Sequence, residues 1–225
     1  MTDVNIRRID KTSVSDADKS AMKRVLAAAF AGYAPHMAIW HNEAANTRLM
    51  DEMVEHFLRR HEVVAAYIGD HVAGVALWVP PGHEFMSDAE AEGMNSLSLL
   101  PPKRGEFVAT RVLPAIDVLT DASFPDAEEE WHYLFMLATD PTVQGSGVGS
   151  ALLAHKIAER GDVPLCLHTN SERNARFYAR TGFTQRAEHN LPLPFGAVWN
   201  DRFFTLPADA STRAMRELAA EAEST

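Results

Sequence analysis

Cysteine is nearly missing from this chain, which holds only Cys166 among its 225 residues. A single thiol cannot form an intramolecular disulfide, so a scaffold held together by disulfides is excluded. Cys166 lies inside an apolar run, residues 163–168, and no histidine-containing motif accompanies it. The sequence therefore predicts a buried structural thiol rather than a nucleophile.

Long apolar runs are missing as well. None approaches the roughly 18 residues that a membrane-spanning helix needs. The first residues, Met1 to Arg8, lack the basic and then apolar order of a secretion signal. We therefore expect a cytoplasmic protein without a membrane partner.

Positive charge is scarce, with 21 Lys and Arg residues against 31 Asp and Glu residues and a net charge of −10. Binding to nucleic acid relies on clustered Lys and Arg, so no nucleic-acid partner is expected. A cationic substrate such as an amine is compatible with this balance, although solubility alone also explains it. The ten histidines form no H-E-x-x-H motif or Cys/His cluster, so no metal is predicted.

Glycines are concentrated where they carry information. Residues 144–149, here called the glycine loop, read Gln-Gly-Ser-Gly-Val-Gly between an apolar run (131–138) and a helix-like run (150–160). A strand, a glycine-rich turn and a helix start form an anion cradle, because the first helical turn has unpaired N–H groups and a dipole that favours negative charge. The loop predicts a site for a phosphorylated cofactor; an exposed flexible turn is the alternative.

Spacing separates three kinds of phosphate loop. A P-loop needs a lysine that this loop lacks, and a dinucleotide fingerprint would need glycine where Ser150 stands. The pattern Q/R-x-x-G-x-G/A is met by Gln144, Gly147 and Gly149. A second pattern, N-x-x-F-Y-x-x-x-G-F, begins at Asn174 and ends at Phe183.

Together the two patterns resemble the signatures of the GCN5-related N-acetyltransferase (GNAT) superfamily, clearly over residues 131–206 and more weakly upstream. The tail, with Asn190-Leu-Pro and a final strand around Trp199, most resembles the puromycin N-acetyltransferase-like members. The resemblance implies transfer of the acetyl group of acetyl-CoA to a primary amine by direct attack, without a metal.

The resemblance also implies roles for particular residues. Tyr178 would protonate the leaving CoA thiolate, and a backbone N–H near Leu137 would stabilise the oxyanion. The cofactor would be bound by the strand edge, the glycine loop with the residue after it, and one asparagine: Leu137, Ala138, Thr139, Gln144, Gly145, Ser146, Gly147, Val148, Gly149, Ser150 and Asn174. In the superfamily, two central strands splay apart to admit the pantetheine arm.

The general base stays open at this stage. Glu130, His132, Tyr33 and Glu43 are candidates, and a water relay is another. Strand alternation predicts His132, Leu134 and Met136 on one face, opposite Trp131, Tyr133 and Phe135.

The hydrophobic share of 46% is enough for one core. We expect a single α+β domain over residues 1–206, with a helical insertion at about 83–126 and a helical tail at 207–225. Periodicity predicts helices at 17–30, 43–61, 88–99, 103–119 and 148–160, a loop at 31–42, and strands at 4–9, 63–68, 72–79, 131–138, 163–168, 183–190 and 197–205. The resemblance turns these strands into one seven-stranded, mixed but mostly antiparallel sheet with helices on both faces.

Three functions fit these observations. The first is a small-molecule amine N-acetyltransferase acting as a monomer or homodimer. The second is a non-catalytic acetyl-CoA sensor or scaffold, and the third is a protein or peptide N-acetyltransferase. The insertion and the 31–42 loop would crowd a peptide groove, which favours a small molecule.

Overall fold

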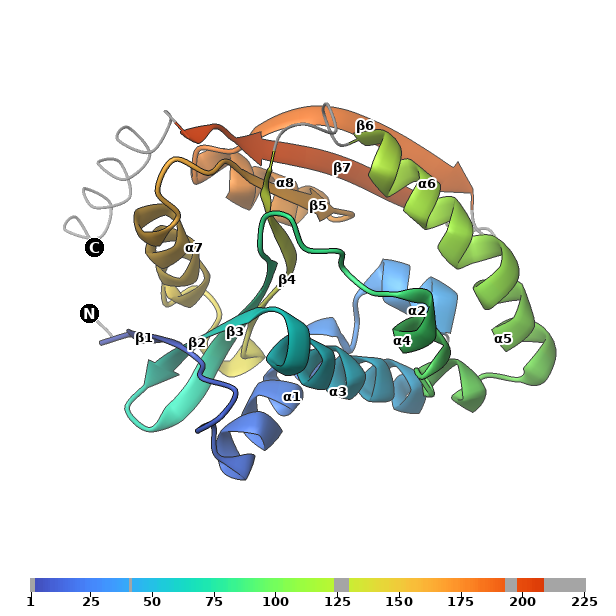
Figure 1. The fold of residues 1–225 in the computed structure, drawn as a ribbon, viewed down its shortest axis with the longest axis horizontal. Helices are drawn as coiled ribbons and strands as arrows, with labels where there is room; N and C mark the ends of the chain where they lie inside the picture. The colour runs from blue at the N-terminus through green and yellow to red at the C-terminus, as the bar shows by residue number, and fades with distance from the viewer. Residues whose placement is uncertain (1–2, 41, 124–129, 193–197, 209–225) are drawn as a thin grey trace.

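The computed structural model describes residues 3–40, 42–123, 130–192 and 198–208. Their strands form one sheet in the order β1-β2-β3-β4-β5-β7-β6 (Figure 1). β4 and β5 run parallel, and the other neighbouring strands are antiparallel. This confirms the predicted sheet. The strands are β1 (Asn5–Arg8), β2 (Glu62–Ile68), β3 (His71–Val79), β4 (His132–Thr139), β5 (Leu165–Thr169), β6 (Thr184–Pro192) and β7 (Val198–Leu206).

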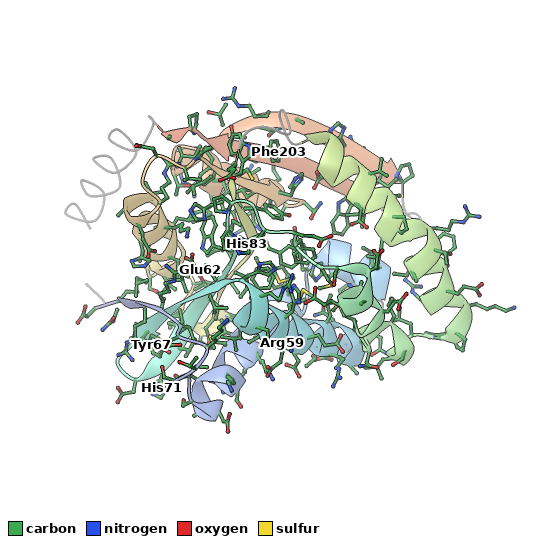
Figure 2. All side chains as sticks on the ribbon, in the orientation of Figure 1. Arg59, Glu62, Tyr67, His71, His83 and Phe203 are labelled. Atoms are coloured by element: carbon green, nitrogen blue, oxygen red, sulfur yellow. The ribbon has the colours of Figure 1, made fainter. Side chains whose placement is uncertain are left out.

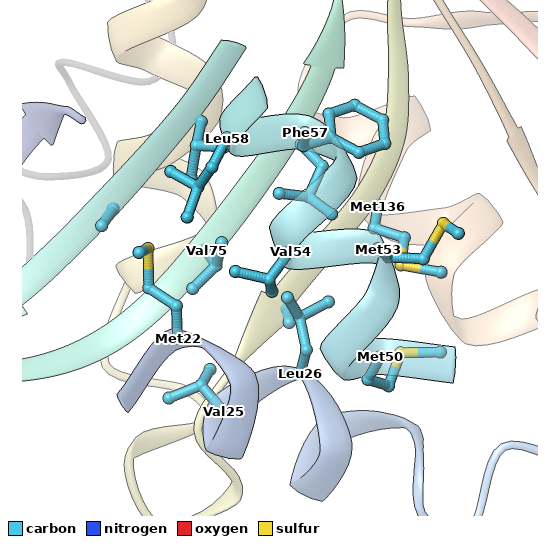
Figure 3. Packing of buried hydrophobic residues seen from close by; sticks show 14 of the residues in the cluster. Met22, Val25, Leu26, Met50, Met53, Val54, Phe57, Leu58, Val75 and Met136 are labelled. Carbon is cyan, nitrogen blue, oxygen red and sulfur yellow. The ribbon is translucent and has the colours of Figure 1, made fainter. Parts of the chain in front are cut away.

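Helices cover both faces of the sheet. On one face α1 and α3 pack against β2, β3 and β4 around Met22, Phe57 and Val75 (Figure 3). On the other face α7 and α8 pack against the same sheet around Trp78, Leu152 and Leu167. The helices are α1 (Asp16–Phe30), α2 (Ala34–Trp40), α3 (Glu43–Arg60), α4 (Asp88–Glu92), α5 (Pro102–Phe107), α6 (Leu113–Ser123), α7 (Val148–Glu159) and α8 (Glu172–Arg180), with 3₁₀ turns η1 (Ser96–Leu99) and η3 (Pro141–Val143) and a π turn η2 (Val108–Val112).

The central strands are buried because both faces are covered. Every residue of β3 after His71 is buried, and so is β2 up to Tyr67. Strands covered on both sides need apolar side chains at nearly every position, which explains why Val, Ala and Leu dominate both strands. Trp78, fully buried in β3, anchors the face beneath α7.

Two sequence predictions were wrong in the first half of the chain. The expected loop at 31–42 contains α2, where Pro35 stands in the first turn and so withholds an N–H that has no helical partner there. The expected helix at 88–99 is the short α4, followed by Gly93 and the separate turn η1. Glycine favours the helical state poorly, which shortens the helix.

The remaining insertion is a nearly continuous helical rod, α5-η2-α6. Pro114 stands at the start of α6, where it lacks an N–H for the carbonyl one turn earlier. The π turn η2 directly precedes it and absorbs this misfit. The rod packs with α2 and the β6–β7 hairpin around Trp40, Val108 and Val112, with Trp199 at the margin. In Figure 1, α6 runs beside the far end of β6.

Three further predictions concern the C-terminal tail, membrane-spanning helices and metal sites. The tail helix at 207–225 lies outside the described residues except for Pro207 and Ala208. No described helix is long and apolar enough to cross a membrane. Within the described ranges, no group of three or more His, Cys, Asp or Glu side chains is arranged to hold a metal ion.

Candidate functional site

The most distinctive feature of the sheet is the separation of β4 from β5. The two strands pair only from His132 to Leu134 on β4, opposite Leu165 to Leu167 on β5. Beyond that point β4 stays paired with β3 as far as Thr139, while β5 stays paired with β7. The strands therefore diverge, and the backbone of β4 after Leu134 is not paired with β5. An unpaired strand edge offers N–H and C=O groups to an extended ligand.

A β-bulge in β4 lies at the start of this divergence. Leu77 of β3 is opposite Met136 and Trp78 is opposite Leu134, so Phe135 is an extra residue. The bulge breaks the predicted alternation: Met136 packs with Phe135 on the α1/α3 face, whereas Leu134 packs on the α7/α8 face. Bulges bend a strand and re-aim its side chains, and they are common next to functional sites.

The glycine loop joins the open end of β4 to α7. Gly145 and Gly147 have φ values of 88° and 87°, which side chains other than glycine rarely adopt. Gly147 is the N-cap of α7 and has no side chain to accept the first-turn N–H groups. The loop is exposed from Gln144 to Gly147. These N–H groups fit an anion such as a pyrophosphate.

The first turn of α7 also meets the end of β4. A Cβ on Gly149 would stand 3.5 Å from both Phe177 Cζ and Thr139 Oγ1. Glycine at this position therefore lets the helix approach the strand and α8 at ordinary contact distance. The start of α7, the end of β4 and α8 therefore meet, and with the glycine loop they form one wall of the divergence.

Helix α8 carries the second signature. Ser171 caps it by accepting a hydrogen bond from the Asn174 N–H at 3.4 Å. Asn174 and Tyr178 stand one turn apart on the same side of the helix. Gly182, with φ 93°, adopts the αL conformation just beyond the helix end.

Tyr178 is buried among the rings of Phe183 and Phe204, at centroid distances of 5.9 and 6.3 Å. Burial is the main cause that raises the pKa of its phenol, and the nearby Tyr33 raises it further. Tyr178 is therefore a protonated donor near neutral pH. The structure places it on the α7/α8 face of the sheet.

The four candidate bases do not gather at the divergence. His132 lies where β4 and β5 are still paired. Its pKa is lowered to about 4, mainly by burial and also by the positive charge of Lys156. Glu130 is exposed beside Gly82, next to the same paired end. Glu43 lines an open groove of about 600 Å³ between α1 and α3, with Lys23 and Asp51.

Tyr33 does reach the divergence, but as a structural link. Its hydroxyl accepts a hydrogen bond from the Asn170 backbone N–H at 3.2 Å, directly after β5. Burial, as the largest cause, raises the pKa of its phenol, so the phenol stays protonated near neutral pH and little phenolate is available as a base. Tyr33 ties the α1–α2 turn to the end of β5.

A residue pair that the sequence prediction missed lies beside Tyr33. His168 on β5 donates from Nδ1 to Asp201 Oδ2 on β7 at 2.7 Å, and the two side chains are only 9% and 4% exposed. The partners are far apart in sequence and meet through β5–β7 pairing. The available signal was weak, because His168 follows the apolar run 165–167 whereas Asp201 stands between the polar residues Asn200 and Arg202.

Known proteins share this architecture. The sequence model of the acetyltransferase (GNAT) domain family matches residues 117–185. A Corynebacterium glutamicum structure described as histone acetyltransferase HPA2 and related acetyltransferase has a TM-score of 0.62 and 22% identity over 91% of this chain and 96% of that chain. A Drosophila melanogaster polyamine N-acetyltransferase that forms N-acetylagmatine has a TM-score of 0.56 and 18% identity. The match covers 91% of this chain and 100% of that chain. A mosquito arylalkylamine N-acetyltransferase-like protein has a TM-score of 0.57 and 15% identity. This match also covers 91% of this chain and 100% of that chain.

Proposed function

We propose that the chain is a GNAT acetyltransferase, since the model of that domain family matches residues 117–185, and that it uses acetyl-CoA to acetylate the primary amine of a small molecule. The observation that carries this proposal is the divergence of β4 from β5 between the glycine loop and Tyr178. One end of that wall fits a pyrophosphate and the other end offers a buried proton donor.

Acetyl-CoA supplies the activated acetyl group as a thioester. We assign its pyrophosphate to the N–H groups from Gln144 to Ser150, where Gly147 leaves the first turn of α7 uncapped. The pantetheine arm is assigned to the unpaired edge of β4 at Leu137, Ala138 and Thr139. These are backbone contacts, so they depend on the path of the strand rather than on side-chain identity.

The remaining assignments concern the reacting end. We assign Asn174, one turn before Tyr178 on α8, to a hydrogen bond with the pantetheine arm. Tyr178 donates its phenolic proton to the departing sulfur, because burial keeps the phenol protonated. A backbone N–H near Leu137 donates to the oxyanion.

A small acceptor is favoured by the insertion. The α5-η2-α6 rod packs against α2 and β6–β7. We infer that it leaves less room for an extended peptide on the side of the sheet opposite α7 and α8. The Drosophila protein named above is described as a polyamine N-acetyltransferase that forms N-acetylagmatine, and the mosquito protein as arylalkylamine N-acetyltransferase-like. The likeness of the Asn190 to Trp199 tail to puromycin-type members adds aminonucleosides to the candidate acceptors.

The test is release of free thiol from acetyl-CoA in the presence of an amine panel: agmatine, phenethylamine, a puromycin-type aminonucleoside, and a peptide with a lysine and a free N-terminus. Amine-dependent thiol release with a small amine is the expected result. Release with the peptide alone would replace the proposal with protein acetylation. Stabilisation by CoA without thiol release under any condition would support a sensor or scaffold instead.

A further inference from the structure

The His168–Asp201 pair is a buried acid–base pair whose role the preceding assignments leave open. A carboxylate can only accept hydrogen bonds, so the 2.7 Å contact places the imidazole proton on Nδ1 and the basic lone pair on Nε2. A carboxylate buried this deeply is costly unless it is paired. Such a pair fixes both the tautomer and the ring orientation of the histidine, which is how base and orienter cooperate in hydrolytic triads.

The position of the pair is as informative as its chemistry. His168 is the first residue of β5 beyond the segment that pairs with β4. Leu167, directly before it, packs on the α7/α8 face together with Tyr178. His168 instead contacts Tyr133 and Phe203, at ring-centroid distances of 5.8 and 4.9 Å. Alternation along β5 thus places His168 and Tyr178 on opposite faces of the sheet at the point of divergence.

This arrangement suits a reaction that needs an acid and a base on two sides of one carbonyl. In such a reaction the sulfur would leave toward the face where the cofactor wall lies, and the amine would approach from the other face. Free alkylamines are protonated near pH 7, so the amine must lose a proton before it attacks. Asp201 and Asp117 both act electrostatically on the Tyr133 phenol, which His168 contacts.

We propose that His168 is the general base that accepts the proton of the substrate ammonium group at Nε2, and that Asp201 is its positioning residue. This inference rests on the proposed function. The neutral amine nitrogen then bonds to the thioester carbon and the C–S bond breaks with its electron pair on sulfur. Tyr178 gives the sulfur a proton and regains one, through water, from the nitrogen, which carries one proton too many for an amide. The net proton released is the one on His168.

The decisive experiment compares two acceptors at one pH: phenethylamine and its β,β-difluoro analogue. The two fluorine atoms, on the carbon next to the aminomethyl group, withdraw electrons and make the amine far less basic. A larger share of the analogue is therefore already neutral at the assay pH. His168→Gln should lower kcat/KM for phenethylamine about 10²-fold, the usual contribution of a general base, and lower it much less for the difluoro analogue. Asp201→Asn should show the same selectivity with a smaller loss, because it keeps a hydrogen-bond acceptor without the charge.

The controls separate chemistry from folding. His71→Gln removes an exposed histidine at the start of β3, in a part of the molecule well away from Phe203 (Figure 2). This control should keep wild-type rates. Acetyl-CoA affinity measured by calorimetry should be unchanged in all three variants. If His168→Gln fails to bind acetyl-CoA, the test rests on Asp201→Asn. Its loss of kcat/KM should then be larger for phenethylamine than for the difluoro analogue.

An equal loss for both amines, or no loss for either, would show that His168 is structural and would overturn this inference alone. A wild-type protein that releases thiol with no amine of the panel would overturn the proposed function, and this inference with it.

Discussion

The hydroxyl of Tyr33 and the backbone N–H of Asn170 form a hydrogen bond of 3.2 Å that joins the α1–α2 turn to the end of β5. The Asn170 side chain continues the link by donating to the Asn200 carbonyl on β7 at 3.0 Å. Three segments distant in sequence are therefore held together at the point where β4 and β5 have diverged. These hydrogen bonds therefore give this side of the divergence a preformed surface.

Removing this link should destabilise the protein. In Tyr33→Phe the Asn170 N–H loses its acceptor in a partly buried site, and an unsatisfied buried donor costs about 1–3 kcal/mol. We expect the free energy of unfolding in urea to fall by that amount. Tyr67→Phe is a suitable control, because its hydroxyl donates to the half-exposed Asp18, where water can substitute. Equal stability of the Tyr33 variant and the wild type would contradict the prediction.

The glycine loop should tolerate no side chain at Gly147. Gly147→Val would place a branched residue at φ 87° and over the first-turn N–H groups of α7. Acetyl-CoA affinity measured by calorimetry should fall below detection. Gly161→Val is a matched control, because Gly161 has φ 63°, has open space around it, and lies beyond the other end of α7. The control should lose a similar amount of stability from backbone strain, about 1–2 kcal/mol, and keep its affinity. Equal acetyl-CoA affinities in the two variants would contradict the assignment of the pyrophosphate to the glycine loop.

Tyr178→Phe should separate catalysis from cofactor binding. The ring packs against Phe183 and Phe204, so phenylalanine can keep that packing while losing the acidic proton. We expect kcat to fall about 10²-fold, in the range of general acid catalysis, with unchanged acetyl-CoA affinity. Full turnover by this variant would exclude the acid role.

How much the sequence foretells can be judged from β4. Its apolar run, the glycine loop and the helix after it are local patterns, so both signatures and the sheet were predictable. The extra residue Phe135 was not, because a bulge is defined by the partner strand and leaves no trace in the spacing of one strand. Alternation therefore assigned Met136 to the wrong face.

The His168–Asp201 pair escaped prediction for a related reason. His168 is one polar position after an apolar run and Asp201 is one of three successive polar residues, and only β5–β7 pairing brings the two within 2.7 Å. Helix α2 was missed because Gly32 and Pro35 are common in loops, although proline is also well accommodated in a first helical turn.

A buried ion pair joins β2 to α7. Lys156 Nζ lies 2.8 and 2.9 Å from the two carboxylate oxygens of Glu62, and both side chains are at most 3% exposed. Glu62→Gln would leave the ammonium group without its buried counter-charge, which typically costs about 3–5 kcal/mol. The double variant Glu62→Leu/Lys156→Met should recover most of that loss, because apolar residues of similar volume need no partner. Urea unfolding of both variants checks this, and a single variant as stable as the wild type would refute it.

The stability of the protein should fall on mild acidification, with His36 as one cause. Its ring stacks on Phe30 at 5.0 Å, and burial lowers its pKa from 6.5 to about 4. The unfolded chain therefore binds a proton first, so the stabilisation is complete above pH 6.5 and is lost as the pH falls toward 4. The full shift corresponds to on the order of 3 kcal/mol, an upper bound because part of the ring remains accessible. Urea unfolding at several pH values should show a shallower decline for His36→Leu than for the wild type. Since His132 also has a pKa of about 4, the difference between the two curves isolates His36, and parallel curves would contradict the assignment.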